Sequence, residues 1–136
     1  MKPKICLVVS EFNGDITAEM QNSAVHKLRD EGLEDEYIKI IYVEGAFEIP
    51  YAISKLINKY DAFIAVGCII KGETPNFDFI SQAITSGIMQ LSISNKKPIG
   101  AAVITCLDKE QAKKRIFRGE EAASAVLDLL ENSYLK

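Results

Sequence analysis

The sequence predicts an α/β protein, a three-layer αβα sandwich around a central four-stranded parallel sheet. Short, uninterrupted apolar runs, typical of strands buried on both faces of a sheet, alternate along the chain with segments of helical periodicity. This alternation favours parallel strands that are covered by helices on both faces. The 136 residues, 48% of them hydrophobic, suit a single domain spanning residues 1–136.

The first strand is predicted at residues 5–9, which read ICLVV. In the helix that follows, apolar residues recur every fourth position, Asn13 and Asp15 are candidate N-caps, and Gly32 ends the pattern. Residues 37–43, rich in Ile and Tyr, form the second predicted strand. A loop at residues 45–48 leads into a helix that has Pro50 in its first turn and ends near Asn58.

The same alternation continues in the second half of the chain. Residues 62–66 are predicted as the third strand, residues 67–72 as a loop, and Thr74 as the N-cap of a helix that reaches about residue 95. Gly87 allows that helix to pack closely. Its apolar face consists of Phe77, Ile80, Ile84, Ile88 and Leu91. Residues 99–105 supply the fourth strand.

Two helices are predicted after the fourth strand. Asp108 and Gln111 indicate a capping-box start for a short helix through Arg115, Gly119 interrupts the pattern, and residues 120–130 form a final amphipathic helix. The predicted elements describe a flavodoxin-like fold, in which ligands bind outside the carboxyl ends of the strands. The loops expected to form a site are residues 10–15, 44–48, 67–74 and 105–108.

Composition narrows the function class. The 16 basic and 19 acidic residues are scattered and give a net charge of −3, so nucleic acid is not an expected partner. Residues 5–9 are too short for a signal-peptide core or a membrane span, which predicts a cytoplasmic protein without membrane association. The widely spaced Cys6, Cys68 and Cys106 are expected to be buried thiols, and His26 a solvated helix residue.

Residues 67–75 could hold an anion, because they lead to a helix start where free N–H groups and the helix dipole are positive. Gly72 lets the backbone come close to a ligand, and Thr74 adds a hydroxyl. An ordinary capped helix is the alternative. The sequence contains no GxGxxG, GxxxxGK[ST], HExxH or GxSxG motif.

Two arginines and two phenylalanines are further candidates. Arg115 and Arg118 lie near the end of the short helix and are either phosphate ligands or solvated side chains. Phe12 and Phe47 lie in strand-end loops, where each either packs against a flat ring or covers the core. The residues alone thus predict a small α/β protein that binds an anionic ligand at its strand ends.

Several ordered motifs resemble the lumazine synthase family over nearly the whole chain. Phe12 and Asn13, with Ile16 after them, are similar to the family's RFN segment, with Glu11 in place of its arginine. The other matching segments are residues 43–50 (VEGAFEIP, similar to VPGAFEIP), 60–62 (YDA), 67–78 (GCIIKGETPNFD, similar to GxVIRGxTxHFD), and 110–115 (EQAKKR, similar to EQAxxR). Their order and spacing make the combination specific.

The resemblance implies a condensation of 5-amino-6-(D-ribitylamino)uracil with 3,4-dihydroxy-2-butanone 4-phosphate, which gives 6,7-dimethyl-8-ribityllumazine and phosphate. It implies no cofactor and no metal. By the matching positions, Phe12 stacks on the pyrimidine, and Glu73 and Thr74 meet the phosphate, which Arg115 reaches from a neighbouring subunit. The remaining implied contacts to the ring and the ribityl chain are Ala46, Phe47, Glu48, Cys68, Ile69 and Ile70.

The sequence departs from the family at three places. Asn76 occupies the position of the family's proton-transfer histidine, and asparagine cannot carry a proton. Ala101 stands where phenylalanine is common, which implies a roomier pyrimidine pocket. Residues 116–121 are shorter than the family's turn, so its phosphate-side lysine has no clear counterpart, and Arg118 is the candidate replacement.

The family forms pentamers, some of which build icosahedral shells. Because the first strand begins near Ile5 and the turn at residues 116–121 is short, an isolated homopentamer with active sites between subunits is predicted. Three alternatives remain: a catalytically impaired paralogue that binds lumazine or flavin, an archaeal-type riboflavin synthase, and a flavodoxin-like electron-transfer module. The GAFEIP segment favours the synthase over the second, and the absence of a Ser- and Thr-rich loop at residues 10–17 disfavours the third.

Overall fold

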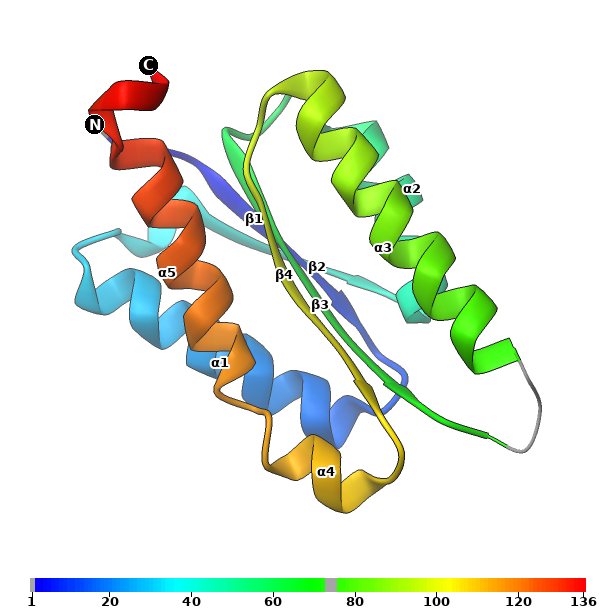
Figure 1. The fold of residues 1–136 in the computed structure, drawn as a ribbon. Coiled ribbons are helices and arrows are strands. Elements are labelled where there is room, and N and C mark those ends of the chain that lie inside the picture. The colour runs from blue at the N-terminus through cyan, green and yellow to red at the C-terminus, as the bar shows by residue number, and fades with distance from the viewer. Residues whose placement is uncertain (1, 73–75) are drawn as a thin grey trace.

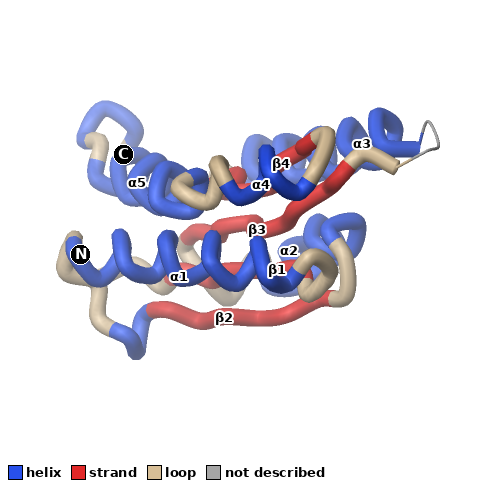
Figure 2. Tube along the Cα trace, turned by 90° about the horizontal axis from the view of Figure 1, so that it is seen from below, coloured by secondary structure: helices blue, strands red, loops and turns tan. Residues whose placement is uncertain are grey.

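The protein is described by a computed structural model that covers residues 2–72 and 76–136. In these residues the strands form one parallel sheet in the order β2-β1-β3-β4, which Figure 2 shows from bottom to top. The strands are β1 (Ile5–Ser10), β2 (Ile38–Val43), β3 (Ala62–Ile70) and β4 (Ile99–Cys106). Their order is that of the first four strands of a flavodoxin-like sheet.

Helices cover both faces of the sheet (Figure 1). On one face lie α1 (Gly14–Asp30) and α5 (Arg118–Glu131), and on the other lie α2 (Ile49–Leu56) and α3 (Asn76–Asn95). The short α4 (Lys109–Lys113) follows β4 directly. This arrangement confirms the predicted three-layer sandwich. None of the helices within the described residues is both long and apolar enough to cross a membrane.

Each face of the sheet has its own apolar core, because successive strand residues point to opposite faces. Leu7 and Ile64 pack towards α1 and α5, whereas Val8 and Phe63 pack towards α2 and α3. All six residues of β1 are buried, as predicted for a strand covered on both faces. The three cysteines are also buried and free, and His26 is exposed, as predicted.

The helix ends agree in part with the predicted signals. Gly32 has a φ of 93° and ends α1, and Leu33 N–H donates to Leu28 C=O at 3.0 Å, as in a Schellman motif. The Asp108 carboxylate accepts the Gln111 N–H at 2.9 Å, so Asp108 is the predicted N-cap of α4. The Gln111 side chain, however, accepts from Leu107 N–H rather than closing a capping box on Asp108.

Three predicted boundaries were wrong. Residues 67–70 belong to β3 and not to a loop, because they continue the parallel pairing with β4 as far as Ile70 opposite Cys106. Tyr37 lies in a short 3₁₀ turn (Asp35–Tyr37) before β2. Gly119 does not interrupt a helix, since α5 begins at Arg118 and Gly119 lies in its first turn. The predicted cap at Thr74 lies outside the described residues.

Candidate active site

The loops that follow the strands meet at one edge of the sheet and are bound to one another. Glu11 N–H donates to Val43 C=O at 2.8 Å, and Phe12 N–H donates to Glu44 C=O at 3.0 Å. These two bonds continue the contact between β1 and β2 beyond the end of β1. The edge is therefore a connected backbone surface rather than a set of separate loops.

Phe12 and Phe47 project from this edge into solvent. Their side chains are 69% and 61% exposed, so neither covers the core, which was one of the two predicted roles. A large exposed ring on a bound backbone is suited to stack on a flat ligand. The exposure of both rings thus favours the ligand-stacking role.

Phe47 belongs to a 3₁₀ turn (Ala46–Glu48) that rests on the end of the sheet. The Glu48 carboxylate accepts the N–H of Gly45 at 2.9 Å, which fixes the start of the turn. Underneath, Gly67 of β3 leaves room for Ala46: a Cβ atom built on Gly67 would lie only 3.1 Å from the Cβ of Ala46. Any larger residue at position 67 would therefore crowd this turn.

The end of β3 presents backbone rather than a reactive thiol. Cys68 is 3% exposed, its side chain packs in the core beneath α1 and α5, and burial raises the pKa of its thiol to about 11. Its carbonyl oxygen accepts the side-chain amide of Asn13 at 2.9 Å. Ile69 and Ile70 are half-buried and continue β3 to the edge of the site.

Arg115 lies after α4, at the carboxyl end of β4. Its Nη1 donates to the carbonyl oxygen of Thr105 at 3.0 Å, and the residue is exposed. Nearby, Lys109 of α4 and Asp15 of α1 form an ion pair at 2.7 Å, and the hydrogen bond from Lys109 lowers the pKa of the Asp15 carboxyl. This pair joins α4, which leads to Arg115, to the helix that follows Phe12.

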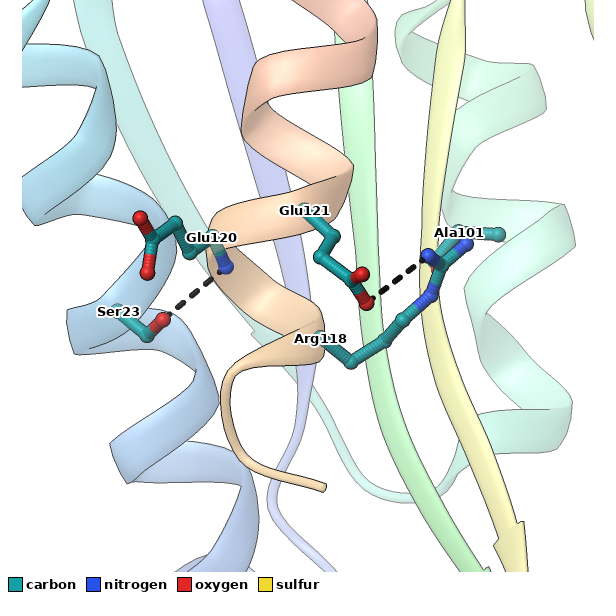
Figure 3. A network of polar contacts seen from close by, with 5 residues as sticks. All are labelled: Ser23, Ala101, Arg118, Glu120 and Glu121. Carbon is teal, nitrogen blue, oxygen red and sulfur yellow. Dashed lines mark hydrogen bonds and ion pairs between the residues drawn. The ribbon is translucent and has the colours of Figure 1, made fainter.

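Arg118, the first residue of α5, contacts β4 farther from the carboxyl end of that strand. Its Nε donates to the carbonyl oxygen of Ala101 at 2.9 Å, and its Nη1 pairs with Glu121 at 3.3 Å (Figure 3). Ala101 and Thr105 are four residues apart on one strand, which is about 13 Å. Within one chain, Arg118 is therefore anchored well away from the Arg115 anchor at the carboxyl end.

The sequence is similar to known proteins over most of its length. Residues 2–133 match the family model of 6,7-dimethyl-8-ribityllumazine synthase. The chain belongs to that family. A lumazine synthase of Corynebacterium kroppenstedtii is 39% identical over 112 residues, which cover 82% of this chain and 69% of the relative. That of Cutibacterium acnes is 35% identical (93% and 80% covered), and that of Bacteroides fragilis is 33% identical (94% of each).

Only part of the predicted lumazine synthase site falls within the described residues. Glu73 and Thr74, the predicted phosphate contacts, lie outside them. Asn76 begins α3, and its side chain is likewise outside the described part. Ala101 is exposed on β4. Residues 2–72 and 76–136 contain no cluster of three or more His, Cys, Asp or Glu side chains that could hold a metal ion.

Sequence reasoning missed one contact of this lumazine synthase edge. Asn13 is the N-cap residue of α1, as predicted, but its side chain makes no capping bond and instead reaches across to β3. The signal available was the αL tolerance of asparagine, since Asn13 has φ 58° and ψ 43°. Which residue that side chain would contact is a tertiary property.

Proposed function

We propose that this protein catalyses the condensation of 5-amino-6-(D-ribitylamino)uracil with 3,4-dihydroxy-2-butanone 4-phosphate, giving 6,7-dimethyl-8-ribityllumazine and inorganic phosphate. The observation that carries the proposal is the family match over residues 2–133, together with relatives of that printed name. The exposed rings of Phe12 and Phe47 at the strand ends support it, because the pyrimidine substrate is flat. We also propose that the protein is cytoplasmic and that the chain forms a single domain.

The proposed chemistry proceeds in three steps. The 5-amino group attacks the ketone carbonyl and forms an imine with loss of water. The C–O bond to the phosphate then breaks and inorganic phosphate leaves. Loss of phosphate, together with the proton at C3, leaves an enol that tautomerises to a new carbonyl at C3 and a methyl group at C4. The ribityl-bearing amine then attacks this new carbonyl, and ring closure releases a second water. None of these steps needs a strongly activated protein nucleophile, and two well-oriented partners can reach effective molarities of about 10⁵ M or more.

Each proposed site residue has a distinct task. Phe12 stacks on the pyrimidine, and the turn Ala46, Phe47 and Glu48 contacts the ring and the ribityl chain. The end of β3, residues 68–70, borders the same space. Glu73 and Thr74 contact the phosphate. Ala101 borders the pyrimidine, and Arg115 of a neighbouring copy reaches the phosphate, for which its planar donors are suited.

Asn76 raises the question of proton transfer in this mechanism. General acid–base catalysis typically contributes about 10²–10⁴ in rate, and an asparagine amide orients a water or substrate without carrying a proton. We propose that positioning supplies most of the acceleration and that the substrate phosphate or water carries the proton. The catalytically impaired lumazine- or flavin-binding paralogue is the alternative that the following assay distinguishes.

Replacing Arg115 with alanine tests the proposed function. In a mixture of purified protein and both substrates, lumazine absorbance should rise faster than in a protein-free control. Arg115→Ala should raise the KM for the phosphate substrate about tenfold, because a charged hydrogen-bond donor is lost. The matched control is Lys114→Ala, which removes one positive charge from the adjacent exposed residue. Saturable lumazine binding without acceleration would instead support the paralogue.

We further propose that the protein is a homopentamer whose copies meet through the outer surface of α2 and α3. The exposed residues of this surface include the apolar Tyr51, Phe79, Met89 and Ile93. Asp78 is the one charged residue in the 20 residues of α3, whereas α1 has five Asp, Glu, Lys or Arg in 17 residues and α5 has five in 14. Asp78 and Lys55 of α2 are exposed charges on these two helices. Exposed apolar surface with few charges is typical of an interface.

Introducing a charge into this surface should dissociate the oligomer. Light scattering should give five copies of the 15.1 kDa chain, about 75 kDa, for the wild type. Ser86→Glu on exposed α3 should shift the mass to that of smaller species, because a buried unpaired carboxylate is costly. Ser124→Glu, on the charged surface of α5, is the control and should leave the mass unchanged. A wild-type mass of a shell would contradict the isolated pentamer.

A further inference from the structure

The β1–α1 loop is joined to β3 by one side chain, that of Asn13. Its Nδ2 donates to the carbonyl oxygen of Cys68 at 2.9 Å, across 55 positions of sequence. β1 and β3 pair along Ile5 to Val9, and Val9 lies opposite Val66. Cys68 is two residues beyond that last pair. The Asn13 amide thus extends the contact between the two segments beyond the paired residues, and it supplies a hydrogen bond to a backbone carbonyl of β3.

The backbone of Asn13 is arranged so that its side chain is free for this contact. Its φ of 58° and ψ of 43° place it in the αL region, which asparagine and glycine tolerate best. Its carbonyl oxygen accepts the N–H groups of Ile16 and Thr17 at 2.9 and 3.1 Å and so begins α1. The side chain makes no capping bond. An N-cap asparagine ordinarily uses its side chain there, so its use across the sheet is a distinct arrangement.

The backbone N–H and C=O groups of Phe12 are both hydrogen-bonded. Its N–H donates to Glu44 C=O at 3.0 Å, and its C=O accepts the Ser10 hydroxyl at 3.3 Å. The Ser10 carbonyl in turn accepts the Thr17 hydroxyl at 2.7 Å, and both Ser10 and Thr17 are buried. These contacts fix the loop against β2 and α1. The Asn13 amide adds the contact that fixes the loop against β3.

We propose that Asn13 is a positioning residue that sets the place of the Phe12 ring relative to the carboxyl end of β3. The inference rests on the proposed function, in which the pyrimidine lies between that ring and the β3 edge. A ring that stacks on the pyrimidine acts only if its spacing from the groups that bind the pyrimidine edge is fixed. Asn13 acts through Phe12 and has no part in the chemistry or in phosphate binding.

The position of Asn13 allows its side chain and its backbone to be tested separately. Asn13→Gly removes the side-chain amide and keeps the αL backbone, whereas Asn13→Ala removes the amide and strains the backbone. Asn13→Asp keeps the shape of the side chain but replaces the donor with a carboxylate that faces the Cys68 carbonyl. Asn22→Ala, at an exposed position of α1, is the control. Two readouts are needed: lumazine formation with each substrate varied in turn, and equilibrium binding of 6,7-dimethyl-8-ribityllumazine by fluorescence.

Asn13→Gly should raise the KM for the aminouracil and the Kd for the lumazine about fivefold, because it loses one hydrogen bond that orders a stacking ring. The kcat and the KM for the phosphate substrate should stay within about twofold of the wild-type values. Asn13→Asp should lose as much or more, and Asn13→Ala should also lower Tm. An unchanged Kd in Asn13→Gly would overturn the proposal, as would an equal change in both KM values and kcat. A wild type that binds lumazine but forms none would overturn only the proposed function, since the Kd comparison still tests Asn13.

Discussion

Gly119→Ala is expected to lower the free energy of unfolding by about 3 kcal/mol or more, because the first turn of α5 has no space for a side chain. A Cβ atom on Gly119 would overlap the carbonyl oxygen of Met20 and would lie 3.2 Å from the amide nitrogen of Ala24. Both are backbone atoms of α1, which cannot rotate away as a side chain can. The two helices would have to separate.

The start of α5 cannot shift freely to relieve this overlap, since it is anchored on both sides of Gly119. Glu120 N–H donates to the Ser23 hydroxyl of α1 at 3.0 Å, and Arg118 is bound to the Ala101 carbonyl of β4 (Figure 3). Moving α5 away from α1 would break the first bond and would open the core that the buried Ala122 and Ala123 share with α1. The cost is therefore both steric and hydrophobic.

Thermal and urea unfolding would check this prediction. A loss of about 3 kcal/mol corresponds to a Tm lower by about 10 °C in a domain of this size. Gly14→Ala is the matched control, because a Cβ atom on Gly14 meets nothing within 4 Å. It should leave Tm nearly unchanged. A Gly119→Ala protein as stable as that control would show that α1 and α5 can repack.

The elements of the fold were predictable because each has a local signal. The buried run of β1 and the Gly32 stop are set by residues within a few positions of one another. The errors arose where a distant residue decides the outcome. Residues 67–72 were predicted as a loop, yet residues 67–70 continue the pairing with β4, and Gly67 among them is needed for the approach of Ala46. Gly119 was interpreted as a helix breaker, whereas its small size serves the contact with α1.

For the candidate site, the location was predictable from the sequence, but the tertiary contacts of its side chains were not. Strand-end loops locate it by a general rule, and the exposure of Phe12 and Phe47 agrees with a ligand-binding role. The targets of Asn13 and Arg118 were not predictable, because the carbonyl groups of Cys68 and Ala101 are identical to every other carbonyl in the sequence. Only the folded chain selects which of them lies within reach. The role of Ala101 at the pyrimidine and that of Arg115 across a subunit boundary remain predictions of the family resemblance.

Gly67→Val is expected to lower kcat/KM for lumazine formation about 100-fold while leaving a folded protein, since catalytic groups displaced by about 1 Å can cost that much. The first added carbon would lie 3.1 Å from the Cβ of Ala46 and 3.3 Å from the Cδ1 of Ile49, and two further methyl groups must be accommodated. Ile49 is the first residue of α2 and is buried in the core, whereas the turn holding Ala46 and Phe47 lies at the surface.

The easier movement is therefore that of the turn, away from the pyrimidine site. Valine itself suits a strand, so β3 should keep its pairing with β4 and the far-UV circular dichroism should be unchanged. The readouts are the initial rate of lumazine formation and the Kd for lumazine, compared with Ala125→Val, which adds two methyl groups at an exposed position of α5. If Gly67→Val loses its fold, Gly67→Ala gives the same test with a smaller displacement. Full activity in a folded Gly67→Val protein would mean that the turn of Ala46 and Phe47 takes no part in binding the pyrimidine.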